Sequence, residues 1–332
     1  MKRLLVLVLS LVFLVSCSSE NNYEKSNFFA MDTFAEIRIY NDVVDVKATA
    51  KSAQRVIENI EKSISKTFED SPVYKINSLT EIADLADKSL LELLTLSMEL
   101  AEITDGYFEP LSGGLVALWE KCESEQRLPT EIEISEQLSN IRTTELRKND
   151  NGSLYKNGQA MLDFGAIGKG YAADKAVDDL KSNGVEVGML SFVSTVSVFG
   201  ERDFKIAVRT PDTSGDIAGY ITMRNEALAV SGDYERFYTI NGEKYNHIVD
   251  PHSGYPASNG IHSVAVVCES AAAADALSTA IFAMGAEKAM ELYSSGLIEF
   301  EALMITDKEI IVTAGMAEKF ELASVKYNLA EI

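Results

Sequence analysis

The chain has few histidines, few cysteines and few basic residues for its length of 332 residues. Its 30 Lys and Arg are outnumbered by 51 Asp and Glu, which gives a formal net charge of −21. A surface of that sign repels phosphate backbones, so we expect no nucleic acid partner. A polyphosphate ligand would need local help from a cation, a helix N-terminus or a metal ion.

The cysteines are Cys17, Cys122 and Cys268. Cys122 and Cys268 have no spacing that indicates a metal site or a disulfide framework, so we expect both to be buried free thiols. The sequence also lacks internal repeats and low-complexity tracts. Its 46% hydrophobic residues are enough for a substantial core.

The first seventeen residues, MKRLLVLVLSLVFLVSC, have the features of a signal peptide. Lys2 and Arg3 precede an apolar run over residues 4–15 that is too short to span a bilayer. The run ends in Leu-Val-Ser-Cys, which fits a bacterial lipoprotein signal with lipidation at Cys17; an ordinary secretory signal with a chance cysteine is the alternative. We expect a signal peptide over 1–17, a flexible tether over 18–27 and one domain over 28–332. The protein would be lipid-anchored to a bacterial membrane and face the periplasm or the cell exterior.

Hydrophobic periodicity predicts a mixed α/β (α+β) chain without the regular alternation of a doubly wound sheet. Residues 120–160 are polar and contain breakers, so we interpret them as an excursion between two halves. We expect strands at 34–40, within 186–209 and 218–230, and at 263–268, and helices at 42–66, 89–104 and 269–285.

Three segments carry candidate chemistry, and the first is the glycine-rich turn LDFGAIGKGYAADKAVDDL over residues 162–180. A glycine-rich turn before a helix lets the backbone approach a phosphate, with Lys169 as the local cation. The spacing is not that of a Walker A loop, and a plain strand-to-helix turn is the alternative.

The second segment is the helix of 269–285, where Asp275 and Thr279 lie one turn apart on the same face. The helix is apolar nearly all round, so the Asp275 carboxylate is expected to be buried and to need a partner. Asp275 and a hydroxyl are oxygen ligands that suit Mg²⁺. The alternative is a core contact with an arginine or a backbone N–H.

The third segment, HIVDPHSGYP over 247–256, gathers two of the three histidines on one predicted tight turn. A histidine at its start could deprotonate a reacting hydroxyl, because its pKa lies near neutrality. The spacing of the histidines excludes the two-histidine zinc helix. A histidine exposed on a turn without a catalytic role is the alternative.

Six motifs, taken together and in order, resemble those of the ApbE family of bacterial FAD:protein FMN transferases, from about residue 28 to the C-terminus. They are M-D-T-F at 31–34, D-G-Y-F-E-P at 105–110, L-D-F-G-A-I-G-K-G-Y at 162–171, S-G-D-Y-E-R-F at 231–237, H-I-V-D-P-H-S-G-Y-P at 247–256 and A-D-A-L-S-T-A at 274–280. The resemblance implies a two-lobed fold with FAD in a cleft between the lobes, close to the glycine-rich turn and the Asp275 helix. It also implies transfer of FMN from FAD to a threonine of a target protein, with Mg²⁺ on the phosphates and release of AMP.

The resemblance also assigns roles to residues. His247 would activate the acceptor threonine, and Asp275 would act in catalysis as a ligand of Mg²⁺. The other expected Mg²⁺ ligands are Ser278, Thr279 and the backbone carbonyl of Ala166. The expected FAD contacts are Met31, Phe68, Tyr107, Phe108, Glu109, Asp163, Lys169 and the backbone at Val249. The expected protein partners are flavin-acceptor subunits of extracytoplasmic electron-transfer proteins.

The sequence departs from the family pattern at several of these positions. Val193-Ser194-Thr195 replaces a usual Gly-Gly-Asn or Gly-Gly-Asp, so side chains stand where backbone approach was open. Glu109 replaces a usual Asp, Ser253 a usual Thr, and Phe68 lacks the hydroxyl of a common Tyr; His252 stands where Lys or Arg is frequent. Two other functions therefore remain open: a metal-dependent FAD pyrophosphatase that yields FMN and AMP, and a flavin-binding lipoprotein without catalysis.

Overall fold

A computed structural model describes residues 23–41, 45–78, 81–83, 88–149, 154–212, 214–234 and 236–331. The predicted signal peptide over 1–17 and its Cys17 lie outside these residues. No helix in the described ranges is long and apolar enough to cross a membrane. The two described cysteines, Cys122 and Cys268, are free and buried, as predicted.

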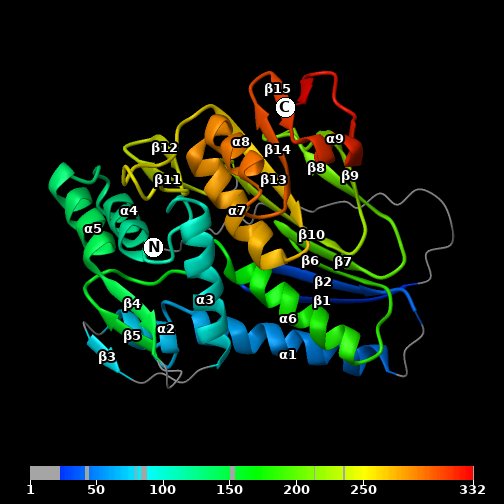
Figure 1. Cartoon of the computed structure of the whole chain (residues 1–332), viewed down its shortest axis with the longest axis horizontal. Helices are drawn as coiled ribbons and strands as arrows, with labels where there is room; N and C mark the ends of the chain where they lie inside the picture. The colour runs from blue at the N-terminus through cyan, green and yellow to red at the C-terminus, as the bar shows by residue number, and fades with distance from the viewer. Residues whose placement is uncertain are drawn as a thin grey trace.

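A large mixed sheet forms the centre of the described structure, in the order β1-β2-β6-β7-β10-β13-β14-β15-β17 (Figure 1). Its neighbouring strands pair antiparallel, except for the parallel pair of β15 and β17. The strands are β1 (Glu24–Ala30), β2 (Thr33–Ile39), β6 (Gly188–Phe192), β7 (Thr195–Phe199), β10 (Glu226–Gly232), β13 (Ile261–Cys268), β14 (Glu301–Thr306), β15 (Glu309–Val312) and β17 (Asn328–Glu331).

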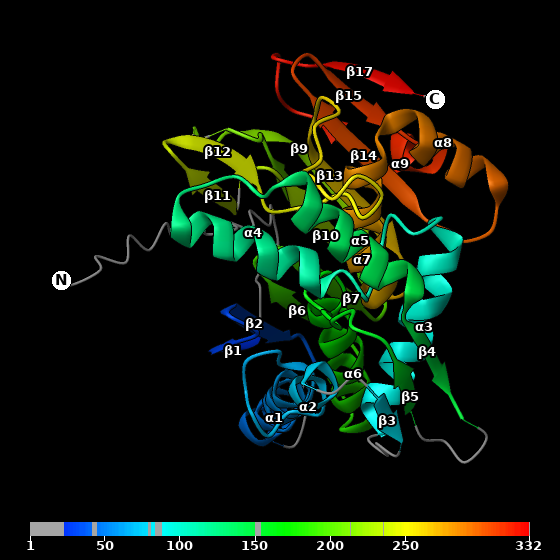
Figure 2. The same ribbon diagram turned by 90° about the vertical axis from the view of Figure 1, so that its left-hand side faces the viewer.

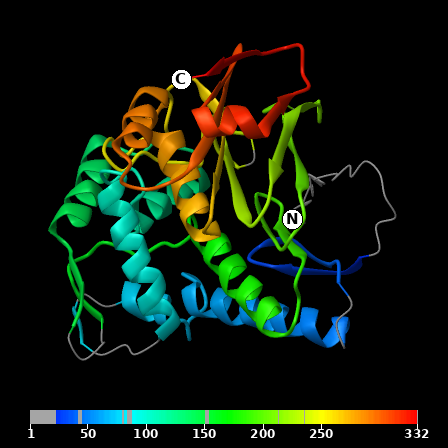
Figure 3. The same ribbon diagram turned by 45° about the vertical axis from the view of Figure 1, so that its right-hand side comes forward.

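One face of this sheet is covered by helices. In Figure 3, the orange α7 meets the green α6, and the blue α1 lies below them. The largest core cluster fills this layer, and it includes the predicted apolar stripe of the first helix at Ala50, Ala53, Ile57 and Ile60. The helices that contribute to it are α1 (Val46–Ile64), α2 (Pro72–Asn77), α3 (Lys88–Ile103), α6 (Gly168–Ser182), α7 (Ala271–Met284) and α8 (Ala286–Ser295).

The opposite face is covered by a small antiparallel sheet of order β16-β9-β8 together with α9. Alternating residues such as Val196 and Val198 of β7 point into this second core, while Phe199 points into the first. The elements of this layer are β8 (Phe204–Arg209), β9 (Ile217–Met223), α9 (Ala314–Lys319) and β16 (Phe320–Leu322).

A smaller lobe with its own core contains α4 (Gly113–Glu125), α5 (Glu131–Thr143) and the hairpin of β11 (Phe237–Ile240) and β12 (Glu243–Asn246). Trp119 lies at its centre, stacked on Tyr238 and hydrogen-bonded through its indole N–H to the carbonyl of Gly254 at 3.0 Å. This lobe agrees with the two-lobed fold that the resemblance implies.

Two sequence predictions need correction here. Much of residues 120–160 is helical, because Thr130 and Glu133 form a capping box that starts α5, and Ile134 and Leu138 then bury one side of the helix. The rest of that stretch supplies β4 (Glu145–Lys148) and β5 (Leu154–Asn157), which pair with β3 (Glu81–Ala83). The predicted tether over 18–27 is also too long at its C-terminal end, since β1 begins at Glu24 and pairs with β2.

Candidate functional site

Helices α6 and α7 pack against each other at their N-terminal turns. There an aspartate side chain of each helix accepts hydrogen bonds from the N-terminal backbone N–H groups of the other. Asp174 of α6 accepts hydrogen bonds from the backbone N–H groups of Ala271 and Ala272, at 2.8 and 3.0 Å. Asp275 of α7 accepts the backbone N–H of Gly170 at 3.0 Å. Each carboxylate therefore satisfies N-terminal donors that have no partner within their own helix.

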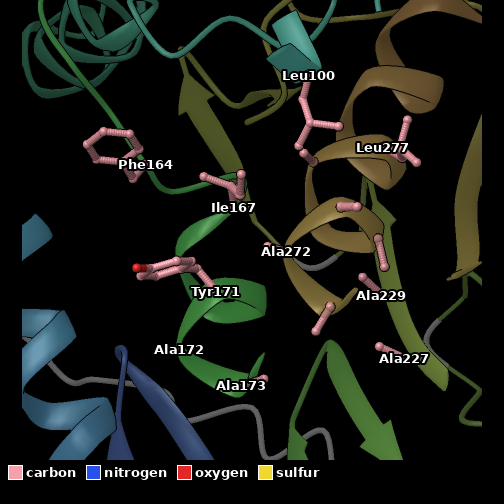
Figure 4. Packing of buried hydrophobic residues seen from close by; sticks show 14 of the residues in the cluster. Leu100, Phe164, Ile167, Tyr171, Ala172, Ala173, Ala227, Ala229, Ala272 and Leu277 are labelled. Carbon is pink, nitrogen blue, oxygen red and sulfur yellow. The ribbon is translucent and has the colours of Figure 1, made fainter. Parts of the chain in front are cut away.

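Gly170 makes this close packing possible. A Cβ at this position would lie 2.1 Å from the carbonyl oxygen of Ala271. Figure 4 shows further small residues on these helices, with Ala172 and Ala173 on α6 and Ala272 on α7. Since the two helices touch here, no space for a ligand remains between them at Gly170.

Asp275 is buried, with 4% of its surface exposed. Burial raises the pKa of its carboxyl, while the charge of Lys169 and the backbone N–H groups of Gly170 and Lys169 act in the opposite direction. The partner that the sequence demanded for this carboxylate is thus in part a backbone N–H, as the alternative without metal expected. This contact leaves the metal-binding role of Asp275 a prediction.

Three hydroxyl groups gather one turn further along α7. The hydroxyls of Ser278 and Thr279 donate to the backbone carbonyl of Asp275, at 2.9 and 3.3 Å. Ser231 of β10 lies 2.8 Å from the Ser278 hydroxyl and 3.3 Å from that of Thr279. The sequence motif at 231–237 contains Ser231, but sequence reasoning gave it no role.

Lys169 is half-buried in the first turn of α6. Its charge acts on the pKa values of both Asp275 and His247, so the ammonium lies near both groups. No carboxylate of the described residues lies within ion-pair distance of it. A half-buried cation in this position suits an anionic group such as a phosphate.

His247 is held by the segment before β11. Its ring Nδ1 lies 2.9 Å from the backbone carbonyl of Arg236, and its backbone N–H donates to the same oxygen at 3.3 Å. Because a carbonyl only accepts, Nδ1 carries the proton and the neutral ring presents Nε2 as a free acceptor. Burial lowers the pKa of His247, and the charges of Arg236 and Lys169 act in the same direction.

The turn predicted at 250–254 is present, but it separates its two histidines. The backbone N–H of Gly254 donates to the Asp250 carbonyl at 2.8 Å, and that of His252 donates to the Asp250 carboxylate at 2.9 Å. The His252 ring packs on Tyr107, with centroids 4.3 Å apart, whereas His247 faces Arg236 and Lys169. The two rings therefore belong to different parts of the site.

The predicted FAD contacts at 107–109 have different environments. The Tyr107 hydroxyl accepts a hydrogen bond from the Lys288 ammonium. Burial raises the pKa of Glu109, whose carboxylate accepts the N–H of Leu111 at 2.9 Å. Phe108 is buried in the main core, so only its backbone is available to a ligand.

Of the remaining predicted contacts, Met31, Asp163 and Ala166 lie near the start of α6. Met31 lies in the β1–β2 turn with φ of 54°, and its Cε would be 3.4 Å from a Cβ on Gly168. Asp163 forms an ion pair with Lys66 at 2.9 Å. The backbone N–H of Phe68 donates to the Ser65 hydroxyl at 3.1 Å, and the Phe68 side chain is exposed, at 48%. Ala166 lies in the turn that leads into α6, and Val249 forms an isolated bridge with Pro256.

Two neighbouring strands of the large sheet, β6 and β7, end earlier than the strands on either side of them. They are joined by Val193 and Ser194; Phe192 at the end of β6 pairs with Ala35 of β2, and Thr195 at the start of β7 pairs with Ala229 of β10. Strand β2 continues past this level to Thr33, and β10 continues to Gly232. The half-buried Val193 and Ser194 thus lie at this short end of the sheet. The buried hydroxyl of Thr195 has no hydrogen-bond partner among the described residues.

The donors near Asp275 can be tested against the predicted Mg²⁺. No group of three or more His, Cys, Asp or Glu that could hold a metal occurs in the described part of the chain. One carboxylate with neighbouring hydroxyls still fits Mg²⁺, because this ion is often bound by one or two carboxylates, waters and substrate phosphates. The same donors do not fit zinc, which prefers cysteine and histidine.

Several residues of this arrangement were missed by sequence reasoning. They are Ser231, Asp174, Lys66 and Arg236, which hold or neutralise predicted site residues. Their roles come from contacts between segments far apart in the chain, and only Ser231 and Arg236 lie in a recognised motif.

The fold defines a two-lobed α/β protein in which several of the motif residues gather near the start of α6. The chain belongs to the ApbE family, whose model matches residues 31–304. Among curated relatives, the FAD:protein FMN transferase of Treponema pallidum is 27% identical and covers 98% of this chain and 97% of its own length. That of Haemophilus influenzae is 24% identical, with 96% and 98% covered.

Solved structures agree with this assignment. The ApbE protein of Thermotoga maritima superposes with a TM-score of 0.79 at 28% identity and covers 91% of this chain and 97% of its own. The flavin transferase ApbE of Vibrio cholerae has a TM-score of 0.77 at 23% identity, covering 90% and 99%, and supports the fold.

Proposed function

We propose that this chain transfers the FMN part of FAD to a threonine hydroxyl of an acceptor protein, with Mg²⁺, and releases AMP. The observation that carries the proposal is the convergence of Asp275, Lys169 and His247 at the N-terminus of α6. All three belong to family motifs, and the relatives that match nearly the whole chain are FAD:protein FMN transferases.

Charge neutralisation is the first task of such a site. The pyrophosphate of FAD is anionic, and the protein carries a formal charge of −21. Lys169 supplies local positive charge in a half-buried position, where it acts more strongly than in water. Phosphoryl transfer depends mainly on positioning and charge stabilisation, so this charge addresses its principal barrier.

The oxygen donors of α7 and β10 would hold the metal ion. Asp275 with Ser278 and Thr279, and the carbonyl of Ala166 from the turn before α6, form the proposed ligand set. When bound, Mg²⁺ neutralises charge on the phosphate oxygens. The Ser231 hydroxyl, 2.8 Å from that of Ser278 and 3.3 Å from that of Thr279, can donate its one proton to either of them and so helps to orient the pair.

His247 is the proposed general base. Its Nε2 would accept the proton of the acceptor threonine as the threonine oxygen forms a bond to the phosphorus of the FMN phosphate. The bond between that phosphorus and the bridging oxygen breaks, and AMP leaves with that oxygen. A lowered pKa keeps the imidazole neutral, which a base requires.

The cellular setting is part of the proposal. Lipidation at Cys17 would anchor the protein to a bacterial membrane, facing the periplasm or the cell exterior. The acceptors would then be flavin-binding subunits of extracytoplasmic electron-transfer proteins.

Product analysis tests the proposed function. Protein lacking residues 1–17 is incubated with FAD and Mg²⁺, with and without a threonine-bearing acceptor domain, and AMP, free FMN and acceptor mass are measured. Transfer predicts AMP together with an acceptor mass gain equal to the FMN moiety. AMP with free FMN and no mass gain would identify a pyrophosphatase, and FAD binding without either product would identify a binding protein.

A further inference from the structure

Three aromatic side chains are exposed on the elements that carry the β1–β2 turn and His247. Phe29 and Phe34 of the β1–β2 hairpin are 60% and 53% exposed, and Phe237 at the start of β11 is 39% exposed. We call these three residues the aromatic rim. Large apolar side chains grouped on a surface commonly mark an interaction site.

The fold itself does not account for this exposure. The core face of the hairpin is formed by buried Ala30, Ala35 and Ile37. Phe29 and Phe34 occupy alternate positions, so they point to the other face, where their rings pack edge to face with centroids 5.6 Å apart. Their mutual contact presents an apolar surface to solvent without stabilising a core.

The rim is joined to the proposed catalytic base. The Arg236 guanidinium lies 3.3 Å from the Asp32 carboxylate, which links the turn between Phe29 and Phe34 to the residue before Phe237. The carbonyl of the same Arg236 accepts the hydrogen bond that orients His247. Figure 2 shows the two hairpins, β1–β2 and β11–β12, on the same side of the molecule.

We propose that the aromatic rim is the docking surface for the folded flavin-acceptor domain. This inference rests on the proposed function, since an acceptor threonine must reach His247 and its domain must therefore contact the surrounding surface. Aromatic side chains are suited to this role, because they supply much of the binding free energy of protein interfaces. The partner surface would carry apolar side chains around its acceptor threonine.

The net charge of the protein favours a protein partner over a membrane. Near the rim, Arg236 is paired with Asp32, Arg38 and Lys25 share the single carboxylate of Glu36, and Lys244 lies 4.0 Å from the centroid of the Phe237 ring. These few cations stand against a formal charge of −21 on the chain, which repels anionic headgroups.

A double substitution tests the surface without touching proposed catalytic or FAD-binding groups. The rim variant carries both Phe29→Ser and Phe34→Ser. Its matched control carries both Leu297→Ser and Val325→Ser, at two exposed apolar residues outside the rim. The probe is the soluble flavin-acceptor domain of a respiratory electron-transfer subunit with its acceptor threonine changed to valine, so that binding is measured without transfer. The rim variant should weaken its binding at least about 10-fold, while the control variant and FAD affinity stay close to wild type.

Parallel assays separate this inference from the proposed function. If wild type transfers FMN and the rim variant binds the acceptor equally well, docking at the rim is wrong and the transferase stands. If wild type binds the acceptor through the rim but transfers nothing, docking stands and the transferase is wrong. Loss of binding to phosphatidylglycerol and phosphatidylethanolamine vesicles in the rim variant, with acceptor binding unchanged, would assign the rim to a membrane and overturn the inference.

Discussion

At the residue scale, hydrogen bonds with backbone groups set the chemistry of two side chains, Asp275 and His247. Asp275 is a buried carboxylate held by the backbone of α6, and His247 is an imidazole whose Nδ1 is fixed by the Arg236 carbonyl. These contacts leave one nitrogen of His247 free as a base and leave Asp275 next to three hydroxyl groups.

The lowered pKa of His247 gives a direction for the pH dependence of transfer. Below its pKa the ring is protonated and cannot accept a proton. The transfer rate should therefore decrease as the pH is lowered, and the midpoint of this decrease should lie below about pH 6.5. His247→Gln should lower kcat by roughly 10²–10⁴-fold and remove this acidic limb. Rates measured across pH check it, and an unchanged acidic limb in His247→Gln would assign the titration to another group.

His262, the third histidine, predicts an effect on stability rather than on catalysis. It lies between the carboxylates of Asp233 and Asp307, at 2.7 and 3.1 Å. Burial alone would lower its pKa, but the two carboxylates raise it overall. The protonated form is therefore stabilised in the folded state, and this contribution is complete below the unfolded pKa of about 6.5 and lost as pH rises through the raised folded pKa.

Melting temperatures of wild type and His262→Gln at several pH values test this linkage. The difference should be largest below about pH 6.5 and shrink in alkaline solution. Asp307→Asn, which removes the more exposed carboxylate, should give a smaller change with the same pH trend. A difference that grows with pH would contradict the assignment.

At the element scale, the crossing of α6 and α7 builds the site. Gly170 lets the helices touch. The hydrogen bonds of Asp275 to the start of α6 and of Asp174 to the start of α7 then fix the position of one helix along the other. The position of Asp275 relative to Lys169 therefore follows from helix packing and not from a flexible loop.

Substitution of Gly170 tests this packing. Gly170→Ala places a methyl group against the Ala271 backbone, which cannot move aside easily, and should destabilise the fold by about 1–3 kcal/mol despite the better helix propensity of alanine. The matched control is Gly168→Ala, where the nearest atom is the flexible end of Ile64 at 2.7 Å. Denaturant unfolding should show the larger loss for Gly170→Ala; equal losses would contradict the packing argument.

The elements were predictable from sequence where hydrophobic periodicity was strong. The apolar stripe of α1 and the nearly apolar α7 were found within a few residues, as were the strands around 186–230. Residues 120–160 were misjudged, since the polar surface of α5 hid a narrow buried side at Ile134 and Leu138. The capping box at Thr130 and Glu133 was the available signal.

The site was predictable only as a set of motifs. Motif order indicated which residues matter, and in the structure the charge of Lys169 acts on both Asp275 and His247. The roles of these residues in binding and catalysis stay predictions. The separation of His247 from His252 could not be seen in the sequence, because it depends on distant neighbours: Tyr107 for His252 and Arg236 for His247. Ser231 and Asp174 act through contacts between distant segments, which a single sequence does not report.

At the scale of the whole molecule, an acidic body presents a local cation to an anionic substrate and an apolar rim to the proposed acceptor. The predicted lipid anchor would place this site outside the cytoplasm. The anchor can be tested independently of the activity.

Metabolic labelling with a clickable palmitate analogue tests the anchor. The full-length protein expressed in a bacterium should incorporate the label, and Cys17→Ser should abolish it. Cys122→Ser removes a buried free thiol and should retain the label. Equal labelling of Cys17→Ser would show that the lipid is attached elsewhere.

The most direct test of the central claim is the mass of a threonine-bearing acceptor domain after incubation with FAD, Mg²⁺ and either wild type or Asp275→Asn. Asparagine keeps an oxygen that can accept the Gly170 N–H but removes the charge, so the fold should survive, as a melting curve can verify. The account predicts an FMN mass gain with wild type and a rate reduced by about 100-fold or more in Asp275→Asn. An equal rate of mass gain in the two proteins would contradict it.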